Sequence, residues 1–156
     1  MAQLLKTGFT AEYSQAHTVA RTNFREHNDC AVIAVSIACG VTYETAHAAL
    51  KAAGRQDRKG TYVHQTVTAI ESLGFRVRTW DRKELRSMID SYPGIHATHK
   101  NITTHHPRRF AKAWEGSGTL LLRTQRHILA CKDGTVHDWT INRSLRVKEV
   151  LVVTKA

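Results

Sequence analysis

The sequence has few chain-breaking residues and no low-complexity stretch: two prolines and nine glycines occur in 156 residues. This composition excludes collagen-like chains and chains that are disordered throughout. No apolar run approaches the roughly 20 residues that a bilayer-spanning helix needs, so we expect no membrane segment. The start, MAQLLKTGFTAEYSQ, has no charged stretch followed by a long apolar one, so we do not expect a signal peptide.

Cysteines and acidic side chains are also scarce. Three cysteines, an odd number, argue against the disulfide framework of a secreted protein and indicate a reducing cytoplasm. Asp and Glu number 13 against 23 Lys and Arg, which gives a formal net charge of +10. This surplus favours an acidic partner, whether nucleic acid, an acidic protein surface or a charged small molecule. The length predicts one domain over residues 1–156 with a core of its own.

Helical patterns fill the first half of the chain. The segment DCAVIAVSIACG is apolar on nearly every side and predicts a buried helix that Asn28 or Asp29 caps and Gly40 ends. We expect two further helices, over residues 43–53 and 63–73.

Strand patterns dominate the last third. FRVRTW predicts a half-buried strand, and short helices are expected over residues 81–90 and after Pro107, with an irregular, histidine-rich segment over residues 92–107. Four further strand-like runs follow: GTLLLRT, HILACK, TVHDW and VKEVLVV. Helices followed by an antiparallel meander predict an α+β domain, with N-terminal helices packed on a C-terminal antiparallel sheet.

Cys30 is the first candidate functional residue, because it lies in the first turn of the buried helix. Unpaired backbone N–H groups and the helix dipole favour a thiolate there. The same N–H groups can donate to an oxyanion. A thiolate nucleophile needs an imidazole to move its proton, and the imidazole needs an orienting group. His127 begins a strand, and the hairpin turn at residues 133–134 brings it near Asp138 in the next strand.

This order of residues resembles the papain-like cysteine peptidase superfamily. NDCAVIAVSIACGVTYETAHAAL followed by RHILACKDGTVHDW is similar to small peptidase domains of the bacteriocin-processing type that phages and bacteria encode. The resemblance implies a papain-like fold, no cofactor, and a thiol hydrolase or acyl transferase in the bacterial or host cytoplasm. It implies that Cys30 is the nucleophile, His127 the general base and acid, and Asp138 the orienting group. The substrate would be a peptide, a protein or another amide or acyl compound, and the positive net charge favours an acidic one.

The sequence departs from this family beside the cysteine. Papain-like enzymes carry a glutamine several residues before the cysteine as an oxyanion donor, and NFREHN contains none. Asn28 is our candidate for that role, with Asn23 as the alternative. Asp29 brings a negative charge that opposes thiolate formation unless its side chain is paired or points away.

Three other interpretations stand beside this one. A catalytically inactive papain-like protein would bind and inhibit a host protein, and a basic nucleic-acid-binding protein would use the net charge. A zinc site would combine Cys39 or Cys131 with histidines, but no CxxC pair or regular ligand spacing exists, so we expect no metal and a solvated loop. The histidines concerned are His96, His99, His105 and His106.

Overall fold

The computed structural model describes residues 19–26, 28–80, 83, 95–97, 102–104, 118–132, 135–137 and 145–156. Within them, residues 19–24 are helical, and three further helices follow: α2 (Cys30–Cys39), α3 (Tyr43–Ala52) and α4 (Val63–Ser72). The strands are β1 (Phe75–Thr79), β2 (Ile95–Ala97), β3 (Ile102–Thr104), β4 (Thr119–Arg123), β5 (Ile128–Lys132), β6 (Thr135–His137), β7 (Leu145–Val147) and β8 (Glu149–Lys155). This architecture is α+β, as the sequence predicts.

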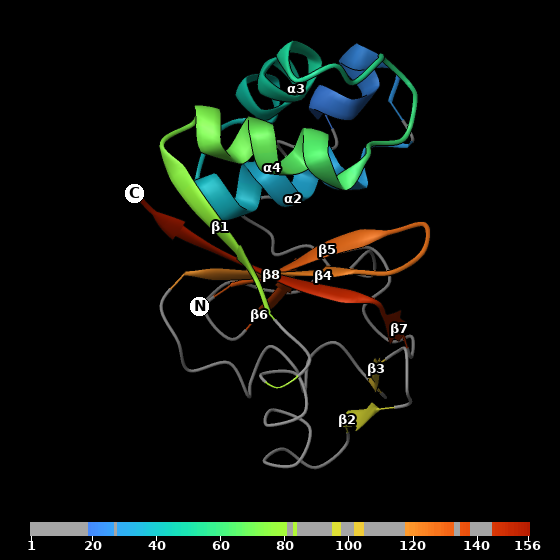
Figure 1. Ribbon diagram of the computed structural model, residues 1–156. Coiled ribbons are helices and arrows are strands. Elements are labelled where there is room, and N and C mark those ends of the chain that lie inside the picture. Colours follow the sequence, from blue (N-terminus) through green and yellow to red (C-terminus); the bar gives the residue numbers. More distant parts are fainter. Residues whose placement is uncertain are drawn as a thin grey trace.

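The larger sheet has five antiparallel strands in the order β1-β8-β4-β5-β6. Strands β4, β5 and β6 form the expected meander, but β8 returns to the other side of β4 and lies between β1 and β4. Figure 1 shows α2, α3 and α4 together on one side of this sheet. The helices therefore form a layer packed against this larger sheet.

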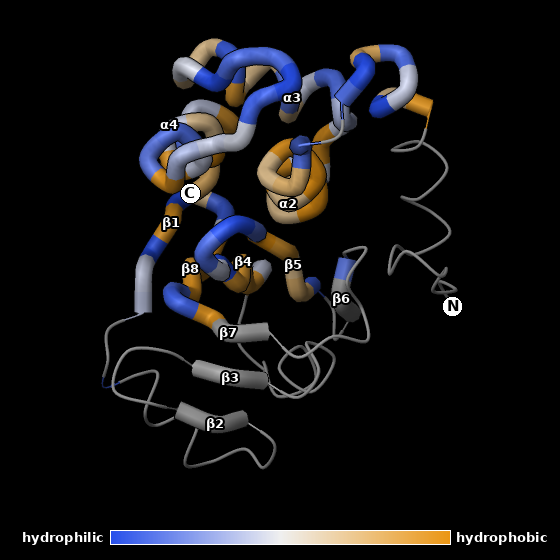
Figure 2. Tube along the Cα trace, turned by 90° about the vertical axis from the view of Figure 1, so that its right-hand side faces the viewer, coloured by the Kyte–Doolittle hydropathy of each residue, from blue (hydrophilic) through white to orange (hydrophobic). Residues whose placement is uncertain are grey.

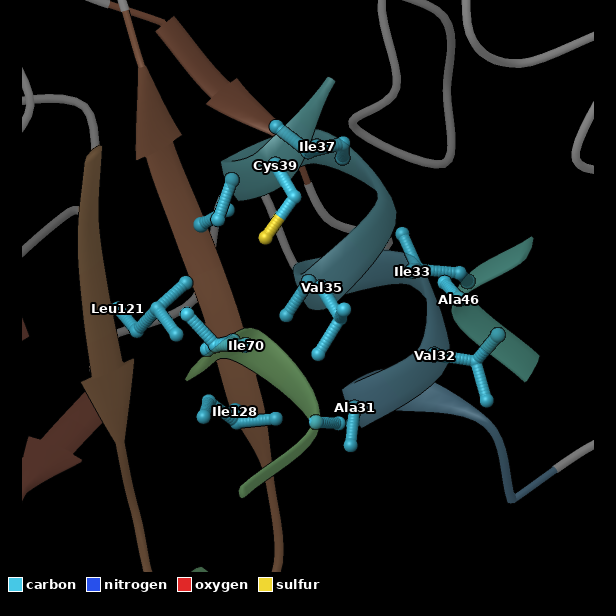
Figure 3. Close-up of a cluster of buried hydrophobic side chains, with 14 of the residues drawn as sticks. Ala31, Val32, Ile33, Val35, Ile37, Cys39, Ala46, Ile70, Leu121 and Ile128 are labelled. Carbon is cyan, nitrogen blue, oxygen red and sulfur yellow. The ribbon is translucent and has the colours of Figure 1, made fainter. Parts of the chain in front are cut away.

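Helix α2 is the centre of the core. Every residue from Ala31 to Cys39 is buried, because α3 and α4 cover one side of the helix and β4, β5 and β8 cover the other. Figure 2 shows α2 as an almost uniformly hydrophobic tube between these layers. In the close-up of Figure 3, Ile33 lies near Ala46 of α3, whereas Cys39 points to the side of Ile70 and Leu121.

The predicted helix boundaries hold closely. Gly40 ends α2 with φ of 62°, a left-handed conformation that glycine adopts without steric cost. Thr42 caps α3, its hydroxyl oxygen accepting a hydrogen bond from the Thr45 N–H at 3.1 Å. On β1, Arg76 and Arg78 are exposed while Phe75 and Val77 are half-buried, which confirms the predicted half-buried strand.

One expectation was wrong. Residues 92–107 are not irregular throughout, because they contain β2 and β3, which pair with each other and with β7 in a second, three-stranded sheet. The short helices expected over residues 81–90 and after Pro107 fall outside the described residues, apart from the helical Lys83. Within the described chain, no single helix has the length and apolar character needed to cross a membrane; α2 and α3 meet that test only as a pair, bent by 113°.

Candidate functional site

Cys30 is the first residue of α2. The first helical hydrogen bond runs from the Ile33 N–H to the Asp29 carbonyl oxygen at 3.1 Å, so the amides of Cys30, Ala31 and Val32 precede the helical ladder. These amides carry the positive end of the helix dipole. The Cys30 side chain is half-buried, in contrast to the buried Cys39 and Cys131.

His127 is positioned by the tight turn between β4 and β5. The Thr124 N–H donates to the His127 carbonyl oxygen at 2.8 Å, and the Thr124 hydroxyl donates to the same oxygen at 3.2 Å. Ile128 follows at once as the first residue of β5 and pairs with Arg123 of β4. The hairpin therefore fixes the backbone of His127 at the end of the sheet.

A cavity of about 360 Å³ joins the two residues. Its lining includes Asn28 and Cys30 from the start of α2, His127 from the β4–β5 turn, and Thr61 and Tyr62 from the segment before α4. The volume is typical of a site for a small molecule or a short part of a chain. The structure thus brings three of the four predicted site residues into one lining, whereas Asp138 lies outside the described residues.

Asp29 turns out to be paired. Its buried carboxylate accepts hydrogen bonds from Arg21 Nε at 2.8 Å and from the Tyr43 hydroxyl at 2.7 Å. Burial raises the pKa of Tyr43 above its usual range, and the hydrogen bond to Asp29 raises it further, so Tyr43 remains a neutral donor. Because the Arg21 guanidinium faces Asp29, the charge beside Cys30 is compensated, which meets the condition set by the sequence.

Asn28 does not cap α2. Asp29 occupies the N-cap position without a side-chain hydrogen bond to the helix, and the Asn28 amide instead donates to the Arg58 carbonyl oxygen at 3.3 Å. The backbone carbonyl oxygen of Asn28 accepts a hydrogen bond from the Arg55 guanidinium at 3.3 Å. The residue before the Cys30 turn is therefore held by the connection between α3 and α4, with its side chain in the cavity wall.

A buried ionic cluster anchors this connection. Both oxygens of the Glu26 carboxylate accept from the Arg55 guanidinium, at 2.9 and 3.0 Å. His47 Nε2 lies 2.8 Å from the same carboxylate, and the Arg58 N–H donates to it at 2.9 Å. Burial alone would raise the pKa of Glu26, but the hydrogen bonds from Arg55 and His47 outweigh it and lower this pKa below its usual value.

The ligand-type atoms of Glu26, His47 and Asp57 lie within 4.8 Å of one another, a spacing that would suit a metal ion. The donor set does not fit one, however, because the Arg55 guanidinium already occupies both oxygens of Glu26. None of the three residues lines the Cys30 cavity. We therefore interpret the cluster as a structural anchor for the segment before Cys30.

The remaining cysteines and histidines of the sequence analysis separate into two groups. Burial raises the pKa of the Cys39 thiol to about 11, against the opposing charge of Lys132, so Cys39 stays protonated near neutral pH. Cys131 is buried in β5. The zinc alternative depends on histidine side chains at residues 96, 99, 105 and 106, and these fall outside the described side chains.

The Glu26 cluster was not predicted from the sequence. One signal was present: Tyr43, Ala46, His47 and Leu50 are the buried positions of α3, so a histidine lies within an apolar stripe. A histidine in such a stripe requires a buried polar partner. Nothing local to Glu26 or Arg55 identifies either residue as that partner.

No family model, curated protein or solved structure matches this chain. The comparisons therefore assign no family to this chain, and the resemblance to papain-like peptidases rests on the two sequence blocks alone.

Proposed function

We propose that the protein is a papain-like thiol hydrolase or acyl transferase that acts on an amide or related acyl bond. Cys30 is the nucleophile and His127 is the general base and acid. Asp138, which follows β6 directly in sequence, is the expected orienting group for the imidazole. The buried helix that begins at the cysteine and the antiparallel sheet beside it support a papain-like arrangement.

One observation carries the proposal: Cys30 and His127 line the same cavity although 97 positions separate them in sequence. Cys30 lies at the N-terminus of α2, and His127 lies in the β4–β5 hairpin of the adjacent sheet. A cysteine at a helix N-terminus and an imidazole in the same cavity are a combination that can activate a thiol as a nucleophile.

In the proposed reaction, Cys30 Sγ attacks the carbonyl carbon while His127 accepts the thiol proton. The resulting oxyanion receives hydrogen bonds from the amide of Cys30 and from the Asn28 side chain, whose second N–H is not needed for Arg58. Collapse of this intermediate breaks the bond to the leaving group, which takes the proton from His127, and leaves a thioester on Cys30. Water or a second nucleophile then accepts the acyl group and restores the thiol.

Alkylation of Cys30 at pH 6 tests the nucleophile and its base together. At this pH, well under about 1% of an ordinary thiol is ionised, so a free cysteine peptide reacts slowly with iodoacetamide. We expect Cys30 to react at least about tenfold faster than the peptide, and His127→Ala to remove this advantage. Peptide mapping by mass spectrometry gives the rate for each cysteine separately.

His64→Ala is the matched control, because His64 is exposed on α4 and does not line the cavity. This variant should keep the fast reaction of Cys30. Comparison with Cys39 and Cys131 alone is insufficient, since burial already slows both. The proposal fails if Cys30 reacts no faster than the free peptide, or if His127→Ala leaves its rate unchanged in a folded protein.

A further inference from the structure

A second cavity adjoins the one that contains Cys30. It has a volume of about 550 Å³ and shares Gly60, Thr61, Tyr62 and Gln125 with the first. It then extends along the connection between α3 and α4 to Gln56 and Lys59. The two cavities are therefore parts of one groove that begins at Cys30 and His127.

The second cavity presents two side-chain hydrogen-bond donors, the Thr61 hydroxyl and the Gln65 amide nitrogen, that have no partner among the described residues. The Thr61 hydroxyl is buried and has no partner there. Gln65 is nine-tenths buried, and while its Oε1 accepts from the Tyr62 N–H at 2.9 Å, no described group bonds to its amide nitrogen. Buried polar groups normally have hydrogen-bond partners, so the buried, unpaired Thr61 hydroxyl in the cavity wall indicates a polar ligand, and the Gln65 amide nitrogen is a second donor available to it.

The charge along the groove has one sign. Lys59 and Arg126 are exposed cations in its walls, and no described carboxylate forms an ion pair with either side chain. Arg123 also lines the first cavity, but it is bound to Glu149 at 2.6 Å. Neither lining, within the part of the chain that the structure describes, contains Asp or Glu. Donors and uncompensated cations together favour an anionic ligand.

We propose that the second cavity is a specificity site for a carboxylate on the substrate, so that Cys30 acts on acidic peptides. The carboxylate would bind Lys59 and the amide donors, a few residues from the attacked carbonyl. This inference rests on the proposed function of Cys30 and deepens it: the first cavity holds the reacting bond, and the second selects an acidic side chain or terminus.

A matched set of peptide chloromethyl ketones tests the site. In each probe, Cys30 Sγ forms a bond to the methylene carbon and chloride leaves, so labelling can be followed by intact mass. We use N-acetyl tripeptides with Glu, Gln or Lys at each position in turn. At one or more of these positions, we expect the Glu probe to bind about tenfold more tightly than the Gln probe of the same shape. A difference of this size corresponds to the free energy of one charge-assisted hydrogen bond.

Lys59→Ala should remove the preference for Glu over Gln, and Lys59→Glu should shift it towards the Lys probe. Lys155→Ala is the control, because Lys155 is exposed at the end of β8 and lies in neither cavity. A loss of preference in Lys155→Ala equal to that in Lys59→Ala would overturn the site, since net charge would then be its cause. Equal binding of the Glu and Gln probes at all positions would also overturn it.

The probes distinguish this site from the proposed chemistry. If Cys30 labels rapidly with all probes and without charge preference, the specificity site is wrong and the thiol chemistry stands. If Cys30 labels no faster than a free cysteine peptide, the proposed function is wrong. Titration of Cys30→Ala with the N-acetylated Glu and Gln peptides provides a binding readout that needs no reaction, and equal affinities there would again overturn the site.

Discussion

At the scale of single residues, the Glu26–Arg55 pair is the most deeply buried ion pair among the described residues. The side chains are 0% and 1% exposed, and the pair joins the segment before Cys30 to the connection that lines both cavities. The Glu26→Gln substitution keeps the shape of the side chain but leaves the Arg55 charge buried without its counter-ion. We expect a loss of about 3–5 kcal/mol in the free energy of unfolding, measured by urea denaturation.

Lys51→Gln is the control for this prediction, because it removes one partner of an exposed ion pair on the same helical layer. Lys51 is 64% exposed and lies 3.4 Å from Asp57. Its loss should cost less than about 1 kcal/mol. Similar losses in the two variants would contradict the anchoring role of Glu26.

The stability lost in the Glu26→Gln variant should depend on pH. Because the Glu26 pKa is lower in the folded protein than its usual 4.5, its contribution to stability is complete above pH 4.5. This contribution is lost as the pH falls through the folded-state pKa. The difference in unfolding free energy between wild type and Glu26→Gln should therefore shrink as the pH falls below 4.5, and a constant difference would contradict this assignment.

At the scale of secondary-structure elements, the approach of β4 to β8 depends on Gly118. This residue has φ of 92°, and a Cβ atom built on it would overlap the Val153 carbonyl oxygen of β8. We expect Gly118→Ala to lower the free energy of unfolding by more than about 2 kcal/mol, measured by thermal and urea denaturation.

The Gly74→Ala variant is the control that separates the cost of backbone strain from the cost of a steric clash. Gly74 has a similar φ of 88°, but nothing lies within 4 Å of a Cβ built there. Its substitution should cost about 1 kcal/mol, the strain of a left-handed conformation alone. A Gly118 variant as stable as the Gly74 variant would show that the strands can separate without cost.

The elements that could be predicted from sequence are those with local signals. The run of apolar residues before Gly40 gives α2, and the alternation of Phe75, Arg76, Val77 and Arg78 gives β1. The three-residue strands β2 and β3 are too short for a period to emerge from their histidine- and threonine-rich sequence.

The candidate site also has a part that could be predicted from local sequence patterns and a part that could not. The helix-end cysteine and the strand-start histidine follow from local patterns, and their meeting follows from packing a buried helix on a sheet. The partners of Glu26 could not be predicted, because His47 and Arg55 lie 21 and 29 positions further along the chain. Such pairs leave no periodic trace in a single sequence. The second cavity depends on these partners, since they hold one of its walls.

At the scale of the whole molecule, the net charge of +10 should attract anions to the groove. We expect the ratio of Cys30 alkylation rates by iodoacetate and iodoacetamide to fall as ionic strength rises from about 0.05 M to about 0.5 M, because salt screens the charges that attract only iodoacetate. The same ratio for a small neutral thiol serves as the reference. A ratio as insensitive to salt as the reference would contradict a positive potential at Cys30.

The central position of β8 also determines when the larger sheet can form during synthesis of the chain. Residues 75–79 and 119–123 leave the ribosome before residues 149–155, yet β1 and β4 have no direct pairing and depend on β8 as their shared neighbour. Until β8 arrives, the nascent chain presents open strand edges that another chain could pair with. The helical layer, whose contacts are local, can form earlier. Aggregation during expression is therefore expected from chains that stop within β8, even though the whole lining of the Cys30 cavity has by then been synthesised.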